Sequence, residues 1–157
     1  MMDNVLLARV DDRLIHGQVM TAWMKRLPAK QIIVVDDRTA KDDFMSSVLQ
    51  MAAPQGVKVH VFTCEKAIKL LKKGISKPSI LLAKTPITYK TLIDGGVDIT
   101  AVNIGGMGIN QERTTLHKNI AASPAERDAM KAMMAAGVDI KIQVIPQDSI
   151  VEIKGLL

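Results

Sequence analysis

The sequence predicts a single-domain α/β fold with a mainly parallel sheet and helices on both faces. Short runs rich in valine, isoleucine and leucine alternate along the chain with segments of helical period. Each connection between two such runs is long enough to carry a helix, which favours parallel pairing of the strands. The chain has 157 residues and is 48% hydrophobic, which suffices for one well-buried domain over residues 1–157.

Six of the apolar runs are predicted as strands. Three of them are almost wholly apolar, as expected for strands that are buried on both faces. The last run alternates apolar and polar residues, which is typical of a half-exposed strand. In chain order the predicted strands are residues 4–10, 31–36, 57–62, 79–84, 99–105 and 138–144.

Apolar residues at helical spacing mark the segments between these strands. We predict that they form the core faces of the crossover helices. They are Met20, Trp23 and Leu27 in the first helix, Phe44, Val48 and Met51 in the second, and Ile68 with Leu71 in the third.

The clearest helix start lies at the stretch SPAER. Ser123 is the predicted N-cap, Pro124 the first helical residue, and Glu126 the residue that completes a capping box. Gly137 stands where this helix is expected to end.

The charge balance argues against nucleic-acid binding. Lys and Arg number 21 against 16 Asp and Glu, a net charge of +5, and only 3% of the residues are aromatic. A nucleic-acid surface needs a basic stripe with stacking aromatics, whereas the basic residues here are spread along the chain. The mild basic excess fits a solvated surface, or a partner protein that is acidic or phosphorylated.

The sequence predicts a cytoplasmic protein. No apolar run approaches the roughly 20 residues of a membrane span, and the first residues lack the apolar core and cleavage site of a signal peptide. Cys64 is the single cysteine and has no internal disulfide partner, in agreement with a reducing compartment.

Charged residues crowd together directly after the first predicted strand. We expect residues 11–15 to form the first βα loop and a helix to begin at His16 or Gly17, at the carboxyl edge of the sheet where ligands bind in such folds. Free N–H groups at a helix N-terminus favour a phosphate, and Gly17 leaves the backbone open to close approach. Arg13 offers a guanidinium fork that matches phosphate oxygens.

His16 adds a nucleophilic ring nitrogen to this group. Such a nitrogen can attack phosphorus, while Asp11 or Asp12 could fix the ring tautomer or hold Arg13 in place. In the alternative interpretation, the charges form an ordinary loop salt bridge and His16 only begins a helix. From composition alone, the alternative is favoured.

A family resemblance changes this balance. The segment RVDDRLIHGQV resembles the signature of the enzyme IIB component of the mannose/sorbose family of the sugar phosphotransferase system. VVDD at 34–37, KTP at 84–86 and NIGGMG at 103–108 also fall where that family has them, as does the late helix followed by a strand. The resemblance covers essentially the whole chain.

The resemblance implies a phosphoryl carrier. In that family the histidine of the motif accepts a phosphoryl group from a phosphohistidine on enzyme IIA and passes it to a sugar carried by the membrane components IIC and IID. By the match, His16 is the phosphohistidine intermediate, Arg13 binds the phosphate and Asp11 supports Arg13. The family's fold has a mainly parallel seven-stranded sheet, so we expect the missing seventh strand within TTLHKNI, residues 114–120.

The same resemblance sets the expected partners. Because the motif begins at residue 9, we expect IIA to be a separate chain, and IIC and IID to hold this protein at the inner face of the membrane. Mannose, fructose, sorbose and N-acetylgalactosamine systems share this component, so the sugar stays open, as does a homo-oligomer. A rival function is a phosphometabolite-binding module that uses the same helix N-terminus without covalent chemistry.

Two further groups are candidates for a second loop at the site. Gly105, Gly106 and Gly108, at and beyond the end of the fifth strand, could bring backbone amides to a phosphate or form a tight turn with positive φ. The spacing fails the dinucleotide fingerprint, because Gln111 stands where the last glycine is required.

The acidic pair Asp36 and Asp37 resembles that of a response-regulator receiver. The third strand, however, leads into VFTCEK without an acceptor aspartate. We expect Asp37 or Thr39 to cap the next helix, although a loop beside His16 could also meet the partner.

The remaining histidines give no sign of a metal site. A lone strand histidine such as His60 is usually structural, and His117 lies in a poorly patterned segment. Neither has a cysteine or carboxylate at metal-ligand spacing, so we assign no metal and no other cofactor.

Overall fold

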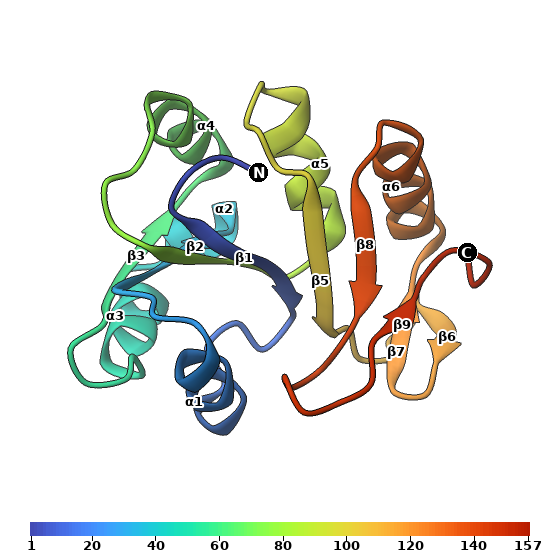
Figure 1. The fold of residues 1–157 in the computed structure, drawn as a ribbon, viewed down its shortest axis with the longest axis horizontal. Helices are drawn as coiled ribbons and strands as arrows, with labels where there is room; N and C mark the ends of the chain where they lie inside the picture. Colours follow the sequence, from blue (N-terminus) through green and yellow to red (C-terminus); the bar gives the residue numbers. More distant parts are fainter.

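Seven strands form the central sheet (Figure 1). The computed structural model describes all of residues 1–157. From edge to edge the strands are β3 (Lys58–Phe62), β2 (Gln31–Val35), β4 (Ser79–Ala83), β1 (Val5–Asp11), β5 (Ala101–Gly106), β8 (Asp139–Ile142) and β9 (Val151–Glu152). Every neighbouring pair is parallel except β8 and β9, which are antiparallel. The predicted mainly parallel sheet is confirmed.

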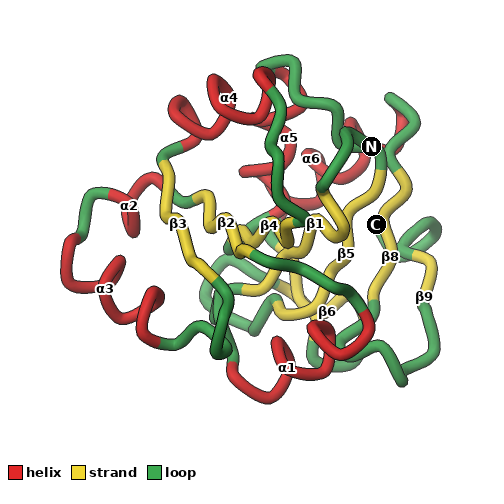
Figure 2. The backbone as a smooth tube through the Cα atoms, turned by 60° about the vertical axis from the view of Figure 1, so that its left-hand side comes forward, coloured by secondary structure: helices red, strands yellow, loops and turns green.

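Helices cover both faces of the sheet (Figure 2). The helices α1 (Gly17–Arg26) and α3 (Asp43–Met51) contribute Met20 and Leu49 to the buried apolar cluster on one face. The helices α4 (Cys64–Lys73), α5 (Pro86–Asp94) and α6 (Pro124–Ala135) pack into a larger cluster on the other face. The short α2 (Asp37–Ala40) follows β2.

The strands β2 and β4, which the sequence marks as apolar, are buried along their whole length. Ile33 and Leu81 belong to the larger cluster, whereas Ile32 and Ile80 belong to the smaller one. Successive side chains of a strand point to opposite faces, so both layers of helices find an apolar surface. Burying one such side chain stabilises the fold by roughly 1.5–3 kcal/mol.

The predicted core face of α3 is wrong. The side chains of Phe44, Val48 and Met51 are 74%, 40% and 84% exposed, and Leu49 is the residue of this helix that is buried. Because α3 carries apolar residues on more than one side, their spacing could not select the buried side. The helix packs against β3 at the edge of the sheet, which leaves much of its surface in solvent.

The seventh strand does not lie where the sequence analysis expected it. Residues 114–122 form a separate antiparallel hairpin of β6 (Thr114–His117) and β7 (Ile120–Ala122). Lys118, with a φ of 49°, lies in the turn between the two strands. The strand that completes the main sheet is β9, and its two residues are too few to show a period in the sequence.

The helix start predicted at SPAER is confirmed. The Ser123 hydroxyl accepts a hydrogen bond from the Glu126 N–H, and the Glu126 carboxylate accepts one from the Ser123 N–H. Pro124 is the first helical residue, and Gly137, with a φ of 95°, follows the end of the helix. Local contacts build both ends, which is why the sequence alone could predict them.

Candidate functional site

The connection between β1 and α1 carries the residues that the sequence singled out. Asp11 is the last residue of β1 and not, as predicted, the first residue of the loop. α1 begins at Gly17, and His16 is its N-cap residue, as predicted. Because β1 lies inside the sheet between β4 and β5, this loop opens at the carboxyl edge of the parallel strands.

α1 is the one helix of the six whose N-cap side chain makes no capping hydrogen bond. The His16 side chain is exposed, and the first turn of α1 contains no acidic residue. A Cβ built on Gly17 meets no atom within 4 Å. The first-turn N–H groups, at the positive end of the helix dipole, are therefore accessible to an anion.

The carboxylate of Asp11 holds Arg13. Asp11 is fully buried, and its Oδ1 accepts hydrogen bonds of 3.0 Å from both the backbone N and Nε of Arg13. Its Oδ2 accepts a third, also of 3.0 Å, from Arg13 Nη2. The Arg13 side chain remains 42% exposed. A bidentate pair of this kind fixes the plane of the guanidinium as well as its position.

This arrangement selects one of the two roles considered for the aspartates. Asp11 hydrogen-bonds to arginines, and Asp12 to Gly108 and Arg113, so neither carboxylate fixes the His16 ring. Burial alone raises the pKa of Asp11, but the hydrogen bonds from Arg13 and the charges of both arginines outweigh it and hold that pKa below its ordinary value. Asp11 is therefore an anionic support for Arg13.

A buried arginine beneath this pair was missed by the sequence analysis. The Arg9 guanidinium is fully buried, lies 3.2 Å from Asp11 Oδ2, and donates a hydrogen bond of 2.7 Å to Asn103 Oδ1. It also packs 5.6 Å from the centre of the Trp23 ring. Burial lowers the pKa of Arg9, but arginine still keeps its proton in proteins. The available signal was a single arginine in the apolar run VLLARVD. This arginine stands two residues before Asp11, which places the two side chains on the same face of the strand.

The tight turn with positive φ proposed for Gly105 and Gly106 is wrong, whereas the proposed approach of their backbone amides to a phosphate stays a prediction. Both residues lie in β5, and neither has a positive φ. A Cβ on Gly105 would stand 1.9 Å from Arg9 Cζ, and a Cβ on Gly106 would stand 2.5 Å from Asp11 Oδ1. These glycines leave the space that the buried Arg9–Asp11 pair occupies.

The capping role predicted for the acidic residues after β2 belongs to a different residue. Asp36, and not Asp37 or Thr39, caps α2 by accepting hydrogen bonds from the N–H and hydroxyl of Thr39. Asp37 accepts a hydrogen bond of 2.7 Å from the N–H of Cys64 at the start of α4. Because β4 separates β2 from β1, the pair belongs to a different part of the edge from Arg13.

The other histidines belong to strands and not to the β1–α1 loop. His60 stacks on Phe62 in the edge strand β3, and burial together with Lys58 lowers its pKa. His117 lies in β6. No group of three or more His, Cys, Asp or Glu side chains is placed to hold a metal ion.

A cavity of about 550 Å³ opens beside Arg13 at the carboxyl ends of β1, β5 and β8. Its lining includes Arg13 and Gly106, His117 and Lys118 of the hairpin, and Ser149 of the β8–β9 connection. His16 does not line it. The hairpin therefore forms a wall beside the β1–α1 loop.

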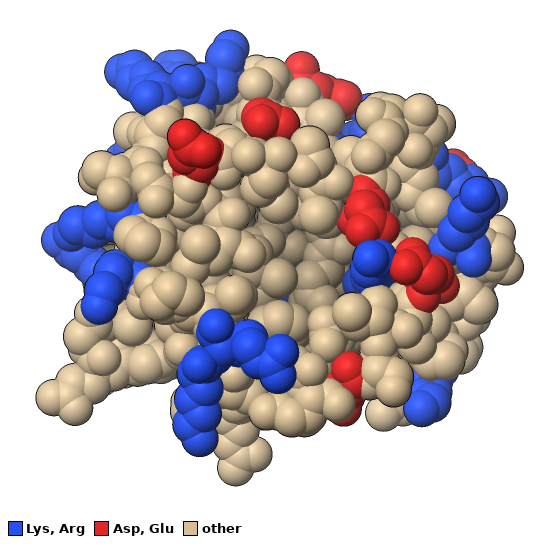
Figure 3. Space-filling view, viewed as in Figure 1, with Lys and Arg blue, Asp and Glu red and all other residues tan.

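Basic side chains gather over α4, over α1 and at the left-hand edge beside β3, while the centre of this face is largely uncharged (Figure 3). The last turn of α1 carries Lys25 and Arg26, and that of α4 carries Lys72 and Lys73. On this face the basic side chains form separate groups and no continuous stripe. None of the helices has the length and apolar composition needed to cross a bilayer.

A doubly wound sheet with polar residues at its carboxyl edge, beside an open helix N-terminus, is typical of α/β proteins that bind anionic groups. The chain belongs to the sorbose subfamily of IIB components of the PTS system, whose family model matches residues 5–157. The resemblance seen in the sequence is confirmed.

Similar proteins agree with this assignment. The mannose-specific EIIAB component of Escherichia coli K12 is 35% identical over 153 residues, which cover 96% of this chain and 47% of that protein. The chain thus spans about half the length of that relative. The N-acetylgalactosamine-specific phosphotransferase enzyme IIB component 2 of E. coli K12 is 31% identical, with 99% of this chain and 100% of that protein covered. The crystal structure of the IIBSor domain of the sorbose permease from Klebsiella pneumoniae matches with a TM-score of 0.92 at 34% identity, covering 99% and 96% of the two chains.

Proposed function

We propose that residues 1–157 act as one IIB domain that carries a phosphoryl group on His16. In this proposal His16 accepts the group from phosphorylated IIA and donates it to a sugar that IIC and IID transport. The supporting observation is an exposed imidazole at the uncapped start of α1, three residues after an arginine that a buried carboxylate holds. The family assignment supports the same chemistry.

The proposed transfer exchanges one phosphorus–nitrogen bond for another. A ring nitrogen of His16 attacks phosphorus, the bond to the IIA histidine breaks, and the proton that His16 loses returns to the IIA imidazole. In the second step a sugar hydroxyl attacks, the bond to His16 breaks, and the imidazole recovers a proton. Such transfers depend mainly on positioning and on stabilising the charge of the phosphoryl oxygens.

Arg13 and the start of α1 would supply that stabilisation. Arg13 uses Nε and Nη2 to bind Asp11, so its Nη1 remains to face a phosphoryl oxygen. The first-turn N–H groups of α1, where Gly17 leaves space, would bind the same dianion. Asp11 acts here as a positioning residue, because its carboxylate is buried beneath Arg13.

We also propose that the chain meets its sugar only at the membrane complex, on the cytoplasmic side. A sugar site normally combines polar groups with an aromatic or apolar platform. Trp23 and Tyr89 are buried in the core and offer no such platform. The names of the similar proteins include mannose, N-acetylgalactosamine, fructose and sorbose, so this set does not single out one sugar.

The test is to incubate the chain with the phosphorylated IIA part of the mannose-specific EIIAB component and to map the label by mass spectrometry at neutral or alkaline pH. We expect label on His16 and none in His16→Ala, with an unchanged circular dichroism spectrum. The matched controls His60→Ala and His117→Ala should accept label normally. Label retained on His60 or His117 in His16→Ala would overturn the assignment. Reversible phosphate binding without covalent label would favour the binding-module alternative.

A further inference from the structure

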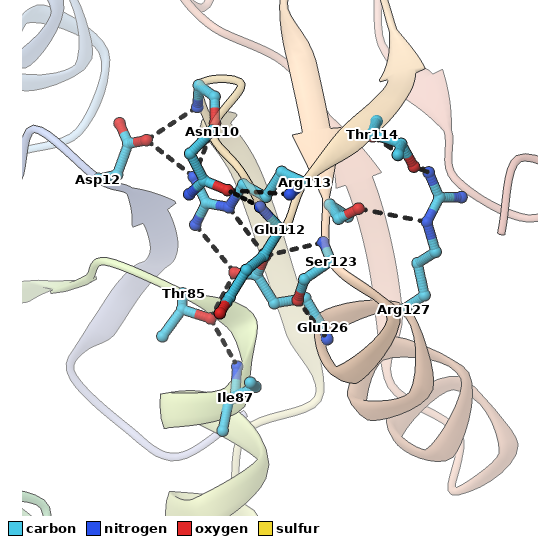
Figure 4. Close-up of polar contacts among 12 residues, drawn as sticks. Asp12, Thr85, Ile87, Asn110, Glu112, Arg113, Thr114, Ser123, Glu126 and Arg127 are labelled. Atoms are coloured by element: carbon cyan, nitrogen blue, oxygen red, sulfur yellow. Dashed lines mark hydrogen bonds and ion pairs between the residues drawn. The ribbon is translucent and has the colours of Figure 1, made fainter.

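A second arginine–carboxylate cluster lies beside the site, centred on Arg113 (Figure 4). Arg113 Nε and Nη2 donate hydrogen bonds of 2.8 and 2.9 Å to the two carboxylate oxygens of Glu126. Its Nη1 donates one of 2.9 Å to Asp12 Oδ2. The side chains of Arg113 and Glu126 are only 9% and 6% exposed. The interaction is therefore a nearly buried ion-pair network and not a surface contact.

This cluster joins three segments that are distant in the sequence. Asp12 belongs to the β1–α1 loop, and Glu126 lies in the first turn of α6. Thr85, the N-cap residue of α5, donates a hydrogen bond of 2.7 Å to Glu126 Oε2. Asn110 Oδ1 accepts from the Arg113 N–H and so fixes the backbone from which the guanidinium extends. Arg113 thus connects the starts of α5 and α6 to the loop that carries Arg13.

The part of that loop that Arg113 fixes lies directly before Arg13. Asp12 Oδ2 also accepts a hydrogen bond of 2.8 Å from the Gly108 N–H, so its carboxylate has two donors from the β5–β6 connection. Two residues later, Leu14 has a φ of 59°, which is unfavourable for a residue with a branched side chain. Such a conformation persists only where the surrounding structure imposes it. The anchored Asp12 carboxylate lies two residues before this position.

We infer that Arg113 is a positioning residue for phosphoryl transfer at His16. It acts through Asp12, which keeps Arg13 and the start of α1 in one geometry before the donor arrives. The inference rests on the proposed function of His16. A displacement of a reacting group by about 1 Å can slow a positioned reaction by up to about 100-fold, so releasing Asp12 should slow transfer while leaving the fold intact.

The chain offers a matched control in Arg127, which Figure 4 also shows. The Nη2 of Arg127 donates hydrogen bonds to Thr114 O and Thr114 Oγ1, and thereby ties α6 to the same hairpin that Arg113 precedes. All the side-chain hydrogen bonds of Arg127 are with residues 114, 115, 122 and 156, and none is with the β1–α1 loop. A change at Arg127 disturbs the hairpin without releasing Asp12.

The experiment uses phosphoramidate, a small phosphoryl donor, so that no partner protein is required. A His16 ring nitrogen forms a bond to phosphorus, the P–N bond of phosphoramidate breaks, and ammonia leaves with the proton that the imidazole loses. Labelling rates at His16 and His60 are measured in the same molecule by peptide mass spectrometry. Their ratio cancels general effects on the chain, since His60 lies on the distant edge strand β3.

We expect Arg113→Met to lower this ratio about tenfold and Arg127→Met to leave it within about twofold of the original protein. Arg113→Lys should recover part of the loss, because an ammonium can still reach Asp12 but cannot bind Glu126 in a bidentate way. Asp12→Ala leaves the Arg113–Glu126 pair intact and should lower the ratio as well, which preserves the test if Arg113→Met folds poorly.

Two kinds of result would overturn the inference. One is an unchanged ratio in Asp12→Ala or in a folded Arg113→Met; the other is an equal fall in Arg127→Met at matched thermal stability. If His16 and His60 are labelled at nearly equal rates in the unchanged protein, the proposed role of His16 is wrong, and the positioning role of Arg113 is wrong with it. Failure of the inference is thus distinguishable from failure of the proposed function.

Discussion

The helices α1 and α6 begin in opposite ways. At α6, Ser123 and Glu126 exchange capping hydrogen bonds, Pro124 fills the first position, and an acidic residue stands in the first turn. At α1, His16 occupies the N-cap without capping, and no acidic residue follows. Every helix leaves about four N–H groups without partners at its start. In α6 the local sequence supplies hydrogen-bond acceptors for some of these N–H groups, whereas in α1 the groups remain accessible to an anion.

The support of the two helix starts differs as well. Glu126 is both a cap of α6 and the partner of Arg113, so stabilising the helix also orders its neighbours. The α1 start depends instead on a polar layer beneath it, in which Asp11 holds Arg13 and is itself held by Arg9. An open helix start therefore needs its stability from elsewhere in the fold.

The largest effect should come from removing the support under α1. Asp11→Asn leaves the buried Arg9 guanidinium without a counter-charge, and breaking a buried pair in this way costs about 3–5 kcal/mol. We expect urea unfolding to show a loss of this size, together with slower phosphoryl transfer. A loss below about 1 kcal/mol would mean that solvent or another group compensates Arg9.

The same variant has a predicted pH dependence. Because the pKa of Asp11 is lower in the folded protein than its ordinary value, its stabilising contribution is complete above about pH 4, near the unfolded value. The contribution is lost as the pH falls through the lower, folded value. The stability difference between the original protein and Asp11→Asn should therefore be largest at neutral pH and shrink below about pH 4.

An intermediate effect is expected from Arg13→Lys. The ammonium keeps the charge but loses the bidentate contact with Asp11 and the Nη1 group that would face a phosphoryl oxygen. Losing one charge-assisted hydrogen bond in the transition state costs about 1.5–3 kcal/mol, or roughly a 10- to 100-fold slower transfer. Rapid-quench kinetics with phosphorylated IIA would measure it, with binding of IIA unchanged. Wild-type kinetics would assign Arg13 to structure alone.

A smaller effect should come from uncapping α6. Ser123→Ala removes the side-chain cap and costs about 1 kcal/mol of stability. Transfer to His16 should stay within about twofold of the original rate, because Glu126 still binds Arg113. Thermal unfolding and labelling kinetics on one preparation would measure the loss of stability and the rate of phosphoryl transfer separately. A large kinetic defect would show that the α6 cap itself supports the site.

The smallest effect concerns Trp23, the sole tryptophan. Its ring packs on Arg9, and its Nε1 donates a hydrogen bond of 3.0 Å to Val144 O. Arg9 binds Asp11, and Asp11 binds Arg13. A dianion beside Arg13 would therefore alter the surroundings of the indole through these two ion pairs. We expect a small fluorescence change on phosphorylation of His16. An identical spectrum at full phosphorylation would mean that the ion pairs of Arg9, Asp11 and Arg13 do not change when His16 is phosphorylated.

Local patterns in the sequence suffice to predict the fold class and the position of the candidate site. Apolar runs and helical spacing act over a few residues, so they predicted the mainly parallel sheet, the capping box at Ser123 and the helix start at His16. The motif around Arg13 and His16 carried the family assignment for the same reason, since it is local in the chain.

The surroundings of these residues depend instead on contacts between distant segments of the chain. The buried Arg9, the space left by Gly105 and Gly106, and the contact of Arg113 with Asp12 all join strands and loops that are far apart in the sequence. The exposed face of α3 and the two-residue β9 also depend on which neighbours are available. A local pattern records the preferences of a segment, whereas burial and ion pairing are fixed by the segments that pack against it.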